Sequence, residues 1–173
     1  MSEESGLSTF RGADGLWEGH EITEVASPEG WQANPKLVNT FYNARRKQLL
    51  EVKPNDGHMD LAQLEKDFDV KIITQNVDDL HERAGSRNIL HLHGELRKVR
   101  NQRGDGVRPW DKDLDLSDLG DDGLPLRPHI VWFGEDVPTI PTAIEWIRKA
   151  DYFVVIGTSL QVYPAANLIY YTA

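Results

Sequence analysis

Polar side chains follow directly after apolar runs of the sequence. The run 70–74 is followed at once by Gln75, Asn76 and Asp78, and a second apolar run ends on His93. Short β-branched runs of this kind predict buried strands. Open α/β sheets bind ligands at the carboxyl ends of their strands. We therefore expect these side chains to line one cleft.

His93 is the candidate catalytic residue. Imidazole titrates near pH ~6.5, so this side chain can act as a general base at cellular pH. The amides of Gln75 and Asn76 can bind sugar hydroxyls or order a water, and the Asp78 carboxylate can accept amide hydrogens. Structural roles stay open for the same residues: His93 could bond a backbone carbonyl, and Asn76 and Asp78 could cap a helix.

A metal site is an alternative use of the same stretch. His91 and His93 alternate along a predicted strand, which places both on one face, and Glu95 could supply a third ligand. This arrangement would indicate a metal-dependent hydrolase.

Composition limits the classes of function. The chain of 173 residues suits one domain, and its 28 acidic against 19 basic residues argue against nucleic-acid and anionic-membrane partners. The absence of cysteine removes disulfides, thiolate metal ligands and a cysteine nucleophile. No apolar run approaches the ~20 residues of a membrane span, and no signal-peptide pattern opens the chain. We expect a soluble cytoplasmic protein.

Strand, turn and helix alternate along the chain, which predicts an α/β fold with a doubly wound, parallel, Rossmann-like sheet. Ser27-Pro28 and Asn34-Pro35 are helix starts, the second helix running to about Glu51. We expect one domain over 1–173, with a helical insertion at about 17–58 and a Gly-, Asp- and Pro-rich flap at 101–128. Further predictions are a helix carrying Leu61, Leu64 and Phe68, strands at His129–Gly134 and Tyr152–Ile156, and a helix at Thr142–Ala150.

Several motifs in this order resemble the sirtuins, which are NAD-dependent protein lysine deacylases. They are 5–11 (SGLSTFR), 74–78 (TQNVD) with 80–81 (LH) and 84–85 (AG), 93–95 (HGE), 131–135 (VWFGE), and 157–160 (GTSL) with 162–166 (VYPAA). The resemblance covers most of the chain. It implies a Rossmann-like sheet, NAD as cosubstrate, acyl-lysine proteins or peptides as substrates, and release of nicotinamide, O-acyl-ADP-ribose and free lysine.

The resemblance also implies roles for single residues. His93 would be the general base, with Asn76 beside it in the catalytic centre. The residues implied to bind the cofactor are Phe10 and Arg11 on a mobile loop, Gln75 and Asn76 at the ribose, Asp78 at the nicotinamide amide, and the turn Gly157, Thr158 and Ser159. Val131, Trp132, Phe133 and Gly134 would pair with the substrate peptide by strand addition.

Tyr42 and Arg45 lie three residues apart on a predicted helix, hence on one face. A phenol and a guanidinium there resemble the signature of sirtuins that remove succinyl, malonyl or glutaryl groups, and Ser8-Thr9 before Phe10 fits the same bacterial and mitochondrial subgroup. In most sirtuins four cysteines hold zinc in the region that matches 101–128, so the resemblance does not extend to zinc here. We interpret the chain as a sirtuin core trimmed at both ends, which leaves a non-catalytic NAD or ADP-ribose binding module as a further alternative.

Overall fold

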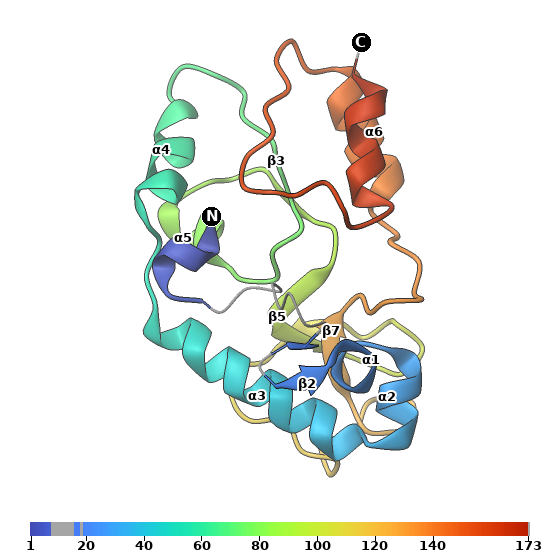
Figure 1. Ribbon diagram of the computed structural model, residues 1–173. Helices are drawn as coiled ribbons and strands as arrows, with labels where there is room; N and C mark the ends of the chain where they lie inside the picture. The colour runs from blue at the N-terminus through green and yellow to red at the C-terminus, as the bar shows by residue number, and fades with distance from the viewer. Residues whose placement is uncertain (8–15, 18, 173) are drawn as a thin grey trace.

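The computed structural model describes residues 1–7, 16, 17 and 19–172 (Figure 1). Of the predicted site residues, Phe10 and Arg11 lie outside the described part. No helix within the described part is long and apolar enough to cross a membrane.

The predicted helix caps are present. The Ser27 hydroxyl accepts a hydrogen bond from the Gly30 amide, and Asn34 Oδ1 accepts one from the Leu37 amide. Proline follows both caps, where its fixed φ suits a first helical position. The helices are η1 (Ser2–Ser5), α1 (Ile22–Val25), α2 (Pro28–Ala33), α3 (Pro35–Glu51), α4 (Asp56–Leu64), α5 (Leu80–Ala84), α6 (Ile140–Arg148) and η2 (Ala165–Tyr171).

The described strands form small sheets. β3 and β4 pair in parallel, with Ile73 opposite Leu90, and this pair carries the polar residues that follow each strand. An antiparallel sheet has the order β6-β5-β7. The strands are β1 (Leu16–Trp17), β2 (His20–Glu21), β3 (Ile72–Thr74), β4 (Ile89–His91), β5 (Gly94–Arg100), β6 (Arg108–Pro109) and β7 (Arg127–Ile130).

The strand predicted at Tyr152–Ile156 is wrong for the structure described. These residues belong to no strand, and Tyr152 and Val154 are 81% and 73% exposed. A strand exists only where a neighbour completes its hydrogen bonds, and no described segment pairs with this one. β7 ends at Ile130, four residues earlier than predicted, and β4 ends at His91.

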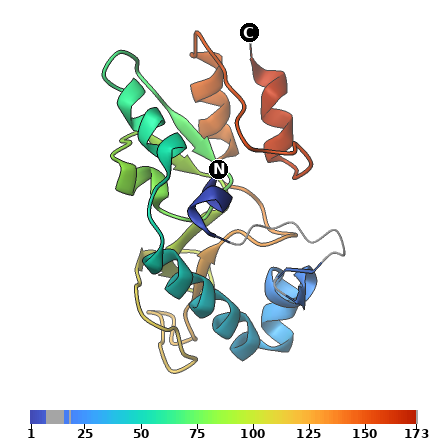
Figure 2. The same ribbon diagram turned by 60° about the vertical axis from the view of Figure 1, so that its left-hand side comes forward.

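Separate apolar clusters hold the two ends of the molecule. In Figure 2, α1, α2 and α3 lie below, α4 lies at the upper left, and α6 and η2 lie at the upper right. The largest cluster joins α1 and α3 to β5 and β7, while another packs α6 and η2 against Leu92. The polar ends of β3 and β4 lie between these clusters.

The segment 101–128, predicted to be a flap, has a small core of its own. Leu114 and Leu126 are buried against Val99, with Trp110 beside them. Asn43 of α3 anchors the segment, because its side chain donates to the Leu114 carbonyl and accepts from the Leu114 amide. The flap is therefore attached to the helix that carries Tyr42 and Arg45.

Candidate active site

One cavity of about 1370 Å³ brings the predicted site residues together. It lies between the end of β3, the segment after β7 and the turn at residues 157–159. Every predicted site residue in the described part of the chain lines it, namely Tyr42, Arg45, Gln75, Asn76, Asp78, His93, Val131, Trp132, Phe133, Gly134, Gly157, Thr158 and Ser159.

The two amides after β3 connect distant segments. Gln75 Nε2 donates to the Thr158 hydroxyl at 3.1 Å, and Asn76 Nδ2 donates to the Ser2 hydroxyl at 2.8 Å. The first bond joins the end of β3 to the turn at 157–159. Both amides are therefore held within the cavity wall, with their oxygens available as acceptors for a ligand.

Asp78 contacts the start of α5 as well as lining the cavity. Its Oδ1 accepts a hydrogen bond from the Leu80 amide at 3.1 Å, and its side chain is buried. This satisfies one of the free amides at the start of α5. Asn76 does not share this role, since its side-chain amide is directed to Ser2.

The hydrogen bond of His93 determines its tautomer. His93 Nδ1 lies 3.2 Å from the Gln75 carbonyl oxygen, which can only accept, so Nδ1 carries the hydrogen. Nε2 is then the basic nitrogen. Burial lowers the pKa of His93 below its ordinary value, although the Gln75 carbonyl acts in the opposite direction. The ring is therefore neutral near pH 7 and can accept a proton at Nε2.

Gly94 is required where the chain leaves the site. Its φ is +84°, and a Cβ at this position would lie 2.1 Å from the His129 carbonyl oxygen. No side chain fits such a close backbone approach. The contact holds β5 against β7 directly beside His93.

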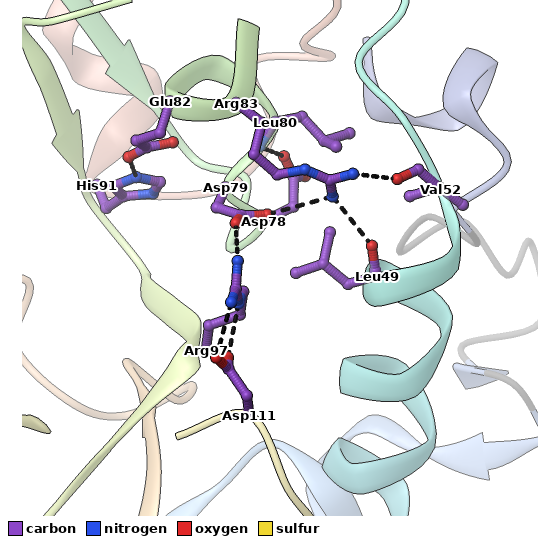
Figure 3. A network of polar contacts seen from close by, with 10 residues as sticks. All are labelled: Leu49, Val52, Asp78, Asp79, Leu80, Glu82, Arg83, His91, Arg97 and Asp111. Atoms are coloured by element: carbon purple, nitrogen blue, oxygen red, sulfur yellow. Dashed lines mark hydrogen bonds and ion pairs between the residues drawn. The ribbon is translucent and has the colours of Figure 1, made fainter. Parts of the chain in front are cut away.

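His91 differs from His93 although both belong to the same motif. Its Nε2 lies 2.7 Å from Glu82 Oε1 (Figure 3). Its Nδ1 lies 3.2 Å from the Asn76 carbonyl oxygen. Burial opposes its charged form, but the hydrogen bond and charge of Glu82, the Asn76 carbonyl and the charge of Glu95 together outweigh burial and raise the pKa of His91. With both nitrogens facing acceptors, His91 is a structural cation.

The predicted metal platform of His91 and His93 is not the arrangement found. Within the described residues, the ligand atoms of Glu82, His91 and Glu95 lie within 4.8 Å of one another, and this group does not include His93. The group keeps His91 and Glu95, two of the three predicted ligands, with Glu82 in the place of His93. The two histidines therefore do not face one common metal position, as the predicted platform requires.

Charged groups below the site fix the start of α5. Figure 3 shows Arg97 between Asp79 and Asp111, and Arg83 reaching the carbonyls of Leu49 and Val52 at the end of α3. Arg97 bonds Asp111 through two nitrogens, each at 2.7 Å. Bidentate pairs of this kind hold their partners in defined orientations. Together, the contacts of Arg83 and Arg97 connect α3, the flap and the start of α5.

Tyr42 and Arg45 form a cavity wall on α3. Tyr42 is fully buried and Arg45 is 7% exposed. Burial raises the pKa of Tyr42, so its hydroxyl stays protonated at any physiological pH. The Trp132 indole N–H donates to the Tyr42 oxygen at 3.1 Å. Sequence reasoning missed this bond, since nothing in the spacing of the two residues indicates it.

The segment after β7 already uses its backbone donors. The amides of Val131 and Phe133 donate to the His93 and Ala26 carbonyls at 2.9 and 3.0 Å. The Trp132 amide donates to Glu135 Oε2 at 2.8 Å. A peptide that pairs with 131–133 would thus bond to carbonyl oxygens of the segment.

A buried histidine pair lies behind Asp78. The rings of His58 on α4 and His81 on α5 have centroids 4.8 Å apart, and both residues are buried. Burial lowers the pKa of His58, and burial together with His58 lowers the pKa of His81 to about 4. Both rings are therefore neutral in the native protein.

Acid should destabilise the protein through His81. Between pH 6.5 and about 4 the unfolded chain binds the proton that native His81 excludes, so the free energy of unfolding falls as the pH falls, by about 3 kcal/mol in total. In urea titrations at pH 6.5, 5.5 and 4.5, His81→Gln should show a smaller decrease than the wild type. Equal slopes for the two proteins would contradict the assignment. The carboxylates that also titrate in this range are present in both proteins, so their contribution cancels.

Comparisons with known proteins give the class of this site. The sequence profile of the Sir2 family matches residues 1–164. The chain is 62% identical over 169 residues to an NAD-dependent protein deacylase of Helicobacter pylori, covering 97% of this chain and 74% of that protein. It is 58% identical to an NAD-dependent protein deacylase of Bacteroides thetaiotaomicron, covering 99% of this chain and 76% of that protein. The chain belongs to the Sir2 family.

Solved structures confirm the α/β, Rossmann-like fold class. A Sir2 homologue in complex with NAD superposes with a TM-score of 0.89 at 41% identity, covering 98% of this chain and 69% of that chain. A Sir2 protein with a deacetylated peptide and 3'-O-acetyl ADP-ribose superposes with a TM-score of 0.83 at 32% identity, covering 99% and 73%.

Proposed function

We propose that His93 and the residues around it carry out NAD-dependent deacylation of lysine side chains, with a preference for acyl groups that end in a carboxylate. The reaction class follows from the family: the chain is a Sir2 enzyme of the NAD-dependent protein deacylase type. The observation that carries the residue assignment is the bond from His93 Nδ1 to the Gln75 carbonyl, which leaves a basic Nε2 at the cavity.

The cavity fits NAD by the chemistry of its lining. The amides of Gln75 and Asn76 suit ribose hydroxyls, and the Asp78 carboxylate suits the hydrogens of a carboxamide. Gly157, Thr158 and Ser159 form a turn of small residues, which lets backbone amides approach a phosphate or the adenosine closely. Phe10 and Arg11 remain sequence-based proposals for the same cofactor.

Bound NAD supplies a ribose carbon that the acyl oxygen of the substrate can attack as nicotinamide leaves. The protein's part is to orient that ribose through Gln75 and Asn76 and to take a proton from a ribose hydroxyl at His93 Nε2. The lowered pKa of His93 keeps this nitrogen unprotonated at neutral pH. Asn76 lines the cavity beside Gln75, where its side chain would position a ribose hydroxyl or a water.

Tyr42 and Arg45 are the proposed acyl readers. They line the same cavity as His93, and Arg45 is a largely buried cation. A cation at this depth favours an anionic group in the adjoining space. A guanidinium can hold a carboxylate through two parallel bonds, and a neutral phenol can donate a third. A neutral acetyl group offers these donors neither a carboxylate nor a negative charge.

The peptide backbone of the substrate is proposed to lie along Val131, Trp132, Phe133 and Gly134. This segment continues from β7 and lines the cavity beside His93. Since the amides of 131–133 already donate within the protein, strand addition here is proposed to use carbonyl oxygens.

Nicotinamide release tests the proposal. With NAD present, the protein should release nicotinamide with succinyl- or malonyl-lysine peptide faster than with acetyl-lysine peptide, and release none without peptide above the hydrolysis background. Chelator-sensitive hydrolysis without NAD would instead support the metal-dependent hydrolase. ADP-ribose binding by calorimetry without turnover on any acyl peptide would support a binding module.

A further inference from the structure

We propose that Trp132 is a positioning residue for acyl selection, because its indole N–H orients the Tyr42 hydroxyl. This inference rests on the proposed role of Tyr42 and Arg45. Trp132 Nε1 lies 3.1 Å from the Tyr42 oxygen, and the two residues are 2% and 0% exposed. An indole N–H can only donate, so the Tyr42 oxygen is the acceptor in this bond.

The hydrogen bond that the Tyr42 oxygen accepts from Trp132 determines the direction of the phenolic O–H bond. A phenol keeps its hydrogen near the plane of the ring, and the indole occupies one side of the oxygen. The hydrogen is therefore directed to the other side. Because burial raises the pKa of Tyr42, that hydrogen is retained. The direction of the Tyr42 hydroxyl is thereby fixed in the wall that it shares with Arg45, and a hydroxyl of fixed direction suits a substrate carboxylate.

Trp132 is itself held in place from several directions. The Arg127 guanidinium carbon lies 3.4 Å from the centroid of the Trp132 ring, and the Trp31 ring lies 5.8 Å away between centroids. Glu135 accepts from the Trp132 amide at 2.8 Å and pairs with Arg127 at 2.6 Å. These contacts fix the indole, and with it the direction of its N–H.

The fixed indole gives a role to the buried charges of β5 and β7 that surround Glu135. Arg127 is 6% exposed, and Arg100 also pairs with Glu135, at 3.1 Å. The ion pair with Glu135 and the cation–π contact with the indole both reduce the free-energy cost of burying Arg127. The segment that is proposed to bind the peptide backbone thereby also sets the geometry of the acyl reader, through a different atom of the same tryptophan.

Trp132→Phe is the test, because phenylalanine keeps an aromatic ring for Arg127 and removes the N–H donor. The measured quantity is the ratio of kcat/KM for succinyl-lysine peptide to kcat/KM for acetyl-lysine peptide. We expect this ratio to fall about 3- to 10-fold, as for loss of one neutral hydrogen bond. Trp110→Phe, in the flap, is the matched control and should leave the ratio at the wild-type value. An equal loss on both acyl groups would overturn the proposal, since it would mean that Trp132 only packs.

A double-mutant cycle separates this inference from the proposed function. In the Tyr42→Phe background the acceptor is absent, so Trp132→Phe should leave the ratio unchanged. If Trp132→Phe instead lowers the ratio by the same factor in the Tyr42→Phe background as in the wild type, Trp132 does not act through Tyr42. That result would overturn the positioning role while leaving Tyr42 and Arg45 as acyl readers. If Tyr42→Phe and Arg45→Met both keep the wild-type ratio, the acyl-reader proposal fails and this inference fails with it. Should Trp132→Phe not fold, benzothienylalanine at position 132 removes the same N–H with the shape of indole and should give the same result.

Discussion

Replacing His93 with alanine is expected to abolish deacylation while leaving the binding of ADP-ribose close to that of the wild type. A base acts on the reaction rather than on the bound ground state, so its loss should appear in turnover. The expected loss is ~10²–10⁴-fold. Single-turnover assays with succinyl-lysine peptide measure the chemical step, and calorimetry with ADP-ribose measures binding.

His91 provides a matched control for this experiment, because it lies two residues away and is held as a cation by Glu82. His91→Gln keeps a polar side chain there and should retain turnover within ~10-fold, since we assign it no proton transfer. A His93→Ala variant that turns over at the wild-type rate would remove His93 from the mechanism. Equal losses in the two variants would mean that both histidines act only through the local structure.

The second large effect is expected from Arg45→Met. Loss of the guanidinium should weaken desuccinylation by about 2 kcal/mol or more, which corresponds to ~30-fold in kcat/KM. Deacetylation should change much less, because the acetyl group carries no carboxylate for Arg45 to bind. A site built to pair with a charge discriminates strongly against the uncharged analogue. Kinetics of both peptides on wild type and variant measure the difference.

Arg46 is the matched control for Arg45. It is the next residue of α3 and is equally buried, but its guanidinium donates to the Leu96 carbonyl and to Asn43 Oδ1. Arg46→Met should therefore lower stability in urea and affect the two acyl peptides alike. Equal losses on both peptides for Arg45→Met would make Arg45 a structural residue of the same kind, and would refute the acyl-reader assignment.

Local features of the fold were predictable where residue types act through their own neighbours. Ser27 and Asn34 cap α2 and α3 as expected, because a side-chain oxygen satisfies an amide only three residues further on. The polar residues after β3 do line a cavity with His93, since parallel strands bring their carboxyl ends to one edge.

Long-range partners account for the predictions that were wrong. The apolar run 152–156 has the composition of a strand, yet it pairs with no described segment and is exposed. Strand propensity reflects packing on a sheet more than an intrinsic backbone preference. The predicted pairing of His91 with His93 as metal ligands was wrong for a similar reason. Glu82 on α5 contacts the His91 ring, and the Gln75 carbonyl contacts the His93 ring.

The sequence by itself determined the order of motifs, the helix caps, the polar ends of β3 and β4, and the residue types of a Sir2 active site. These follow from spacing of a few residues along one chain. Only the tertiary structure showed that burial lowers the pKa of His93 while both nitrogens of His91 face acceptors, and that Trp132 bonds Tyr42 across 90 residues. Such choices depend on which groups are buried together, because burial sets the pKa values and hydrogen-bond partners on which this chemistry depends.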